Sequence, residues 1–120
     1  MNNFNKYREN VYSQNGEDGV LREILFRLSL NRPSTSKNPL WCVEFGAWDG
    51  KQYSNTFSLI KAFAWNAVYI EGDRDKFTDL QKTCMEYPTI HAVNVFVDYL
   101  QNSPYLLDRI LNDMDIFYTY

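Results

Sequence analysis

The chain has 120 residues, of which 45% are apolar and 22% charged, and this balance suits one globular domain and excludes wholesale disorder. A net charge of −3 leaves no basic stripe for phosphates, so neither nucleic acid nor an anionic membrane is an expected partner. The longest apolar runs are far shorter than the ~20 residues that cross a bilayer, and no apolar leader opens the chain, which predicts a cytoplasmic protein.

The first predicted element is an amphipathic helix at about 15–31, where apolar residues recur at steps of three and four. A polar stretch with two prolines, 31–39, ends this helix. Residues 40–45 are then predicted to form a strand that is buried on both faces and closed by Gly46. After a glycine-containing loop, Asn55 is expected to cap a second helix.

Strands and helices continue to alternate in the second half of the chain. Residues 67–71 and 90–97 are predicted strands, and a helix at about 74–85 connects them. Another helix is expected to start at Ser103 and Pro104, and residues 116–120 are suited to begin a fourth strand. The alternation predicts an α/β fold, a three-layer Rossmann-like sandwich with a partial parallel sheet, in a single partial domain over residues 1–120.

Few side chains suit metal binding or nucleophilic catalysis. His91 is the one histidine of the chain, so neither a histidine metal cluster nor a Ser-His-Asp triad is easily assembled, and no metal is expected. Cys42 and Cys84 have no partner motif and are predicted to be buried free thiols.

The most informative motif is VEFGAWDG at residues 43–50, an acidic residue in a strand followed by two glycines. Glycine lets the backbone bend sharply and approach a ligand closely. Glu71, at the end of the next predicted strand, can accept hydrogen bonds from both ribose hydroxyls of an adenosine. Either carboxylate alone is better explained as the partner of a lysine at a strand end, but both together with the glycines favour a ligand.

The length of the loop after Gly50 discriminates between adenosine cofactors. A dinucleotide-binding turn places a glycine in the helix N-terminus to receive a pyrophosphate, whereas here the cap comes only at Asn55. A longer loop that carries Trp48 suits a zwitterionic amino-acid tail, as in S-adenosylmethionine. Glu44 is then a candidate acceptor for the ammonium group of that tail.

Three segments, 12–19, 43–50 with 54–56, and 69–73, resemble FkbM-like class I methyltransferases, and the resemblance extends from about residue 12 to about residue 115. It implies a cofactor cleft over the carboxyl ends of the first two strands, with Glu71 at the ribose and Val97 and Asp98 at the adenine. Ser13 and Gln14 are given no more than a role in closing the pocket. The full set of expected S-adenosylmethionine-binding residues is Glu44, Gly46, Ala47, Trp48, Gly50, Asn55, Glu71, Gly72, Val97 and Asp98.

The chain departs from the family pattern after residue 115, where a fourth strand with an Asp-Gly end would be expected. Without that strand the first strand becomes an open apolar edge, which favours pairing with another copy or a partner chain. The sequence therefore fits a natural truncation, a fragment of a longer gene or half of an oligomer.

The family implies O-methylation of a small molecule or glycan, with the truncated chain inactive if the acceptor site is missing. No catalytic residue is predicted, because methyl transfer requires mainly an in-line approach of the nucleophile. Three alternatives remain open: a non-catalytic nucleoside-binding module, a fragment of an NAD-dependent oxidoreductase, and a remnant that acts only through its sheet edge.

Overall fold

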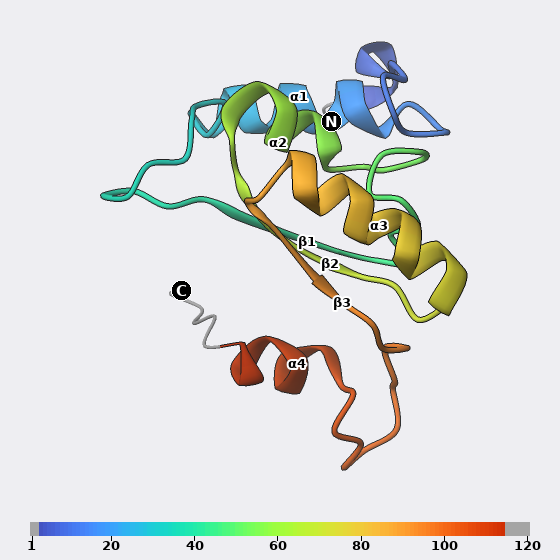
Figure 1. Cartoon of the computed structure of the whole chain (residues 1–120). Helices are drawn as coiled ribbons and strands as arrows, with labels where there is room; N and C mark the ends of the chain where they lie inside the picture. The colour runs from blue at the N-terminus through green and yellow to red at the C-terminus, as the bar shows by residue number, and fades with distance from the viewer. Residues whose placement is uncertain (1–2, 115–120) are drawn as a thin grey trace.

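The computed structural model describes residues 3–114, which form an α/β fold around a three-stranded parallel sheet of order β1-β2-β3 (Figure 1). No helix in this part of the chain has the length and apolar character needed to cross a membrane. The elements are the 3-10 helix η1 (Phe4–Tyr7), α1 (Glu17–Arg27), β1 (Trp41–Phe45), α2 (Phe57–Phe63), β2 (Asn66–Ile70), α3 (Arg74–Glu86), β3 (Ile90–Val93) and α4 (Leu107–Asp113).

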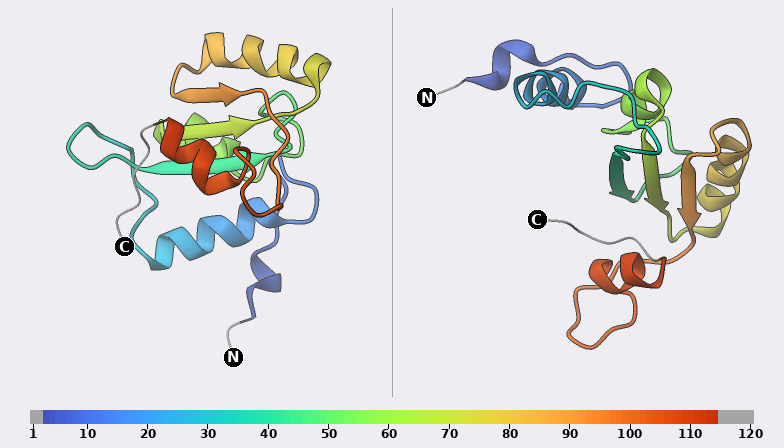
Figure 2. Two further views of the ribbon diagram at one scale, coloured as in Figure 1. Left: turned by 90° about the horizontal axis from the view of Figure 1, so that it is seen from below. Right: turned by 90° about the vertical axis from the view of Figure 1, so that its left-hand side faces the viewer.

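The helices lie on both faces of the sheet (Figures 1 and 2). α2 and α3, which connect successive strands, cover one face, and α4 packs against the other. α1 lies beside α2 on the side nearest β1, and it reaches the core through Leu25, which clusters with Leu59 and Trp65. The sequence-based expectation of helices on both sides of a parallel sheet is confirmed.

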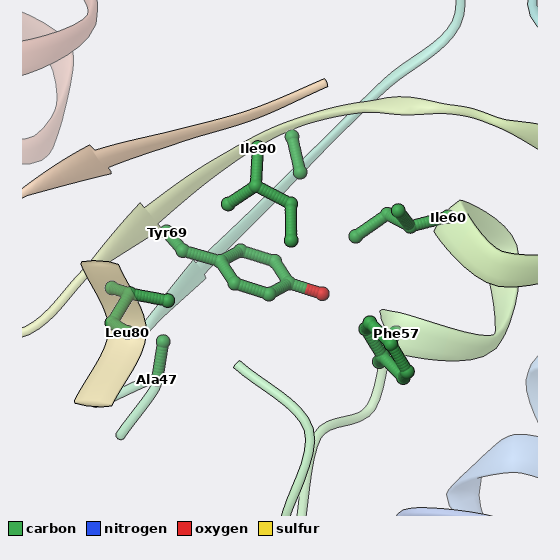
Figure 3. Close-up of a cluster of buried hydrophobic side chains, with 7 residues drawn as sticks. Ala47, Phe57, Ile60, Tyr69, Leu80 and Ile90 are labelled. Carbon is green, nitrogen blue, oxygen red and sulfur yellow. The ribbon is translucent and has the colours of Figure 1, made fainter. Parts of the chain in front are cut away.

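Tyr69 is the centre of the core between the sheet and helices α2 and α3. Its side chain is fully buried among Phe57, Ile60, Leu80 and neighbouring core residues, and its hydroxyl points toward α2 (Figure 3). The phenol therefore supplies apolar surface along its ring and a polar end that needs a partner.

The opposite face is less completely covered. Val68 and Ile70 of β2 pack against Ile110 and Leu111 of α4, whereas the side chain of Phe45 is 60% exposed. Within residues 3–114, β1 pairs only with β2, so one edge of β1 carries no strand. This agrees with the predicted open edge, while the predicted start of a fourth strand at 116–120 lies outside the described residues.

Two predicted element boundaries are wrong because backbone geometry ends the elements early. α1 stops at Arg27 rather than near residue 31, since Ser29 adopts φ 58° and the Leu30 N–H bonds the Leu25 carbonyl, a Schellman-type end. β3 stops at Val93 rather than at residue 97. The side-chain amide of Asn94 donates to the Glu71 carbonyl at 2.8 Å, and this bond takes the place of a further backbone pair between β2 and β3.

The start of α4 was also predicted too early. Ser103 and Pro104 form a turn in which the Ser103 hydroxyl accepts the Tyr105 N–H. Leu106 then remains extended and bridges to Asp98, so the helix begins only at Leu107.

Gly19 lets the segment before α1 lie directly on the helix. Its N–H donates to the Glu9 carbonyl at 3.1 Å, and a Cβ at this position would collide with the carbonyl oxygen of Tyr7. The absence of a side chain therefore fixes how residues 7–9 pack on α1.

Replacing Gly19 with alanine is expected to lower the free energy of unfolding by about 2–3 kcal/mol, because the obstructing atoms belong to the backbone and cannot rotate away. Chemical denaturation measures the change. Phe26→Ala, which removes an exposed side chain from the same helix, is the control and should change stability by less than about 1 kcal/mol. Equal effects of the two substitutions would contradict this packing.

Candidate functional site

The loop 46–56, between β1 and α2, holds half of the predicted cofactor-binding residues. Gly46, Trp48, Gly50 and Tyr53 have φ values of 68°, 52°, 81° and 61°. Glycine adopts such left-handed geometry freely, but each non-glycine residue there costs on the order of 1 kcal/mol. Trp48 and Tyr53 therefore keep this geometry only if other contacts fix the loop.

Glu71 fixes the first half of the loop. Its side chain is almost fully buried, with 6% of the residue exposed. One carboxylate oxygen accepts the Trp48 N–H at 2.8 Å, and the other accepts the Asp73 N–H at 2.9 Å. The backbone strain at Trp48 is thus offset by a charge-assisted hydrogen bond.

Glu44 fixes the second half of the same loop. Its Oε1 accepts the Asn55 N–H at 2.8 Å, and its Oε2 accepts the hydroxyls of Ser54 and Thr56 at 2.7 and 2.9 Å. Because Thr56 donates its one hydroxyl proton to Glu44, the Tyr69 hydroxyl, 2.7 Å away, must donate to Thr56. Burial disfavours the ionised form of both nearby groups. It raises the pKa of the Tyr69 hydroxyl, and it raises the pKa of the Cys42 thiol to about 12.

The structure brings the two predicted carboxylates and the glycine motif together, because Glu44 and Glu71 both bind the loop 46–56 that contains the glycines. No Lys or Arg of residues 3–114 forms a salt bridge with Glu44 or Glu71, so the alternative of lysine partners at the strand ends is wrong. Their partners are instead backbone N–H groups and hydroxyls, which lie in positions that spacing alone does not indicate.

The two glycines of the motif have different environments. A Cβ on Gly50 would meet Leu80 and Tyr69 at 3.0–3.1 Å, so this glycine allows core packing. A Cβ on Gly46 would meet nothing within 4 Å, which leaves its backbone open to an incoming group. Ala47 between them is buried, and its N–H extends the sheet by donating to the Ile70 carbonyl at 3.2 Å.

The residues predicted at the adenine lie after β3. The ring of Phe96, 73% exposed, rests on Gly72 where a Cβ would stand, so Gly72 provides room for a flat ring. Val97 packs toward the α4 side of the sheet, and an oxygen of Asp98 accepts the N–H groups of Tyr99 and Leu100. Sequence reasoning missed Phe96, which only the contact with Gly72 reveals.

Asn55 does not cap α2 as predicted. The helix starts after Thr56, and the Ser54 hydroxyl accepts the Phe57 N–H at 2.9 Å, because Ser54 is already oriented by Glu44. The Asn55 backbone instead takes part in the Glu44 network, and the residue itself is exposed.

Asp18 organises the segment that includes Ser13 and Gln14. One oxygen of its buried carboxylate accepts the N–H groups of Val11, Tyr12 and Ser13 at 2.7–2.8 Å. Ser13 is buried, and its hydroxyl oxygen accepts the Asp18 N–H, whereas Gln14 is exposed. The sequence signal for Asp18, an acid in the first turn of a helix, was available but does not reveal the three donors.

No group of three or more His, Cys, Asp or Glu residues that could hold a metal ion occurs within residues 3–114. His91 stacks on Trp41 with 5.4 Å between the ring centroids, on the sheet face away from the loop. Comparison of the chain with family models, with curated proteins and with solved structures finds no match. The resemblance to FkbM-like enzymes therefore stays a prediction.

The stability that Asp18 provides is expected to depend on pH. Burial opposes ionisation, but the N–H donors of Ser13, Tyr12 and Val11 prevail and hold the pKa of Asp18 below its ordinary value of 3.8. A group with a lowered folded-state pKa stabilises above its unfolded pKa and loses that contribution as the pH falls through the folded value.

Asp18→Asn should therefore lower the free energy of unfolding by about 1–2 kcal/mol at pH 7, because a neutral amide replaces the charged acceptor. The difference from the parent chain should shrink as the pH falls below about 3.8, which denaturation at several pH values measures. Asp113→Asn, at an exposed helix end, is the control. A difference that does not vary with pH would exclude the ionised carboxylate as the source.

Proposed function

We propose that the chain is the S-adenosylmethionine-binding part of a Rossmann-like, class I methyltransferase domain that acts on a hydroxyl of a small molecule or glycan. The observation that carries this proposal is the position of Glu71 beside the open backbone of Gly46. Both follow neighbouring parallel strands at their carboxyl ends, the edge of an open α/β sheet where ligands bind.

The ribose end of the cofactor is the part that fits best. Each oxygen of Glu71 accepts one N–H, and a carboxylate oxygen has two lone pairs, so one acceptor position per oxygen remains for the two ribose hydroxyls. Phe96, whose exposed ring rests on Gly72, offers a face on which the adenine can stack. When bound, the cofactor would supply an electrophilic methyl group on its sulfonium.

The amino-acid end fits less well. Glu44 already accepts three hydrogen bonds, so its proposed ammonium contact has one lone pair left, on Oε1. This engagement favours a second candidate, a module that binds the nucleoside without catalysing transfer. Methyl transfer from labelled S-adenosylmethionine to a panel of glycans and small hydroxyl compounds distinguishes the two, since the module binds the cofactor and releases no methylated product.

Isothermal titration with S-adenosylhomocysteine tests the cofactor site. Glu71→Gln is expected to weaken binding at least tenfold, because the neutral amide cannot accept both ribose hydroxyls while keeping the Trp48 and Asp73 contacts. Asp79→Asn on the exposed face of α3 removes the same charge and should leave the affinity unchanged. Circular dichroism shows whether both variants remain folded.

Titration with NAD is the competing arm of the same experiment. The proposal expects tighter binding of S-adenosylhomocysteine, because the loop 46–56 places no glycine in the first turn of α2 to receive a pyrophosphate. Tighter binding of NAD would instead identify an oxidoreductase-type site. If neither ligand binds, the proposal is overturned, and a chain that acts only through the sheet edge of β1 becomes the favoured alternative.

A further inference from the structure

A cavity of about 300 Å³ lies between α1 and α2, and Asn55, near the end of the loop 46–56, is one of the residues that line it. Its volume is at the lower end of the range for small-molecule sites, which are mainly apolar with a few convergent polar groups. The apolar walls are formed by Val11, Leu21, Leu25, Leu59, Ala62 and Phe63.

The polar lining of this cavity consists of Asp18, Ser58, Arg22, Asn31 and Asn55, and Asp18 is the buried, charged member. Three backbone N–H groups converge on Oδ2 of Asp18, whereas within residues 3–114 Oδ1 accepts only the Ser58 hydroxyl, at 3.2 Å. A carboxylate oxygen has two lone pairs, so Oδ1 can accept one more hydrogen bond. An acceptor on a buried, charged group offers more binding energy than one in water.

The charges around the cavity restrict the ligand further. Asp18 repels a carboxylate or phosphate. The Arg22 guanidinium, which also lines the cavity, is paired with Glu9 at 2.6 Å on the surface and offers the ligand no free charge. An ammonium would lose its hydration against the apolar walls for a single acceptor at Oδ1, whereas a neutral hydroxyl that donates to Oδ1 has much less hydration to lose.

We propose that the cavity between α1 and α2 binds a small neutral alcohol, with its apolar body against Leu21, Leu59 and Ala62 and its hydroxyl donated to Asp18. The cavity shares Asn55 with the expected cofactor-binding residues but takes a different ligand, so each site is tested with its own probe.

Titration of the full chain with benzyl alcohol, followed by amide chemical shifts in 15N–1H spectra, tests the site. The expected result is saturable shifts at Leu21, Ser58 and Ala62. Toluene, which lacks the donor, and benzylamine, which carries a charge, should each bind roughly tenfold more weakly. Equal affinity for toluene, or tighter binding of benzylamine, would overturn the hydroxyl assignment, and shifts confined to other elements would overturn the site.

Ala62→Phe supplies the matched variant. Ala62 is exposed on α2 while lining the cavity, so a ring can enter the cavity without displacing the core, and benzyl alcohol affinity should fall at least tenfold. Met85→Phe adds a ring to the exposed face of α3 and should leave the affinity unchanged. Thermal unfolding confirms that both variants fold, and undiminished binding to folded Ala62→Phe would exclude this cavity.

Discussion

The candidate site depends on the attachment of one loop to two carboxylates. The loop 46–56 contains Trp48 and Tyr53 in left-handed geometry, which the isolated backbone disfavours. Glu71 binds the loop near its start, and Glu44 binds it near its end. Glu44 lies near the carboxyl end of β1 and Glu71 directly follows β2, so the register of the two parallel strands places both acids at one edge of the sheet. The shape of the backbone around Gly46 is therefore a consequence of where β1 and β2 end.

The same device recurs at the N-terminal segment. Asp18 gathers three consecutive N–H groups on one oxygen, as Glu71 gathers Trp48 and Asp73 on two, so ionised carboxylates replace the strand or helix partners that loops lack. Such groups are costly to bury alone, but backbone N–H donors compensate for the buried charge of each. Loops built in this way are rigid without being part of regular secondary structure.

The sequence predicted the elements better than their ends and their contacts. The strands 41–45 and 66–70 follow from apolar runs closed by glycine, and these signals are local. The end of α1 depends on a left-handed residue, Ser29, and the end of β3 on a side chain, Asn94, that donates to the carbonyl of Glu71 just after the neighbouring strand β2. Neither is visible in a periodic pattern. The hydrogen bond between Glu71 and the Trp48 N–H depends on the fold as a whole. Sequence spacing therefore predicted that the two residues lie near each other, but it could not predict this bond.

Asn55 shows how the two proposed sites share a framework without sharing a ligand. Its backbone N–H donates to Glu44, while the residue also lines the cavity beneath α1, and α2 starts two positions later. Ser58, in the first turn of that helix, reaches Asp18, so the Glu44 network and the Asp18 network meet in four consecutive residues. Because both carboxylates fix the same short segment, the position of α2 relative to α1 and the geometry of the loop 46–56 are set together.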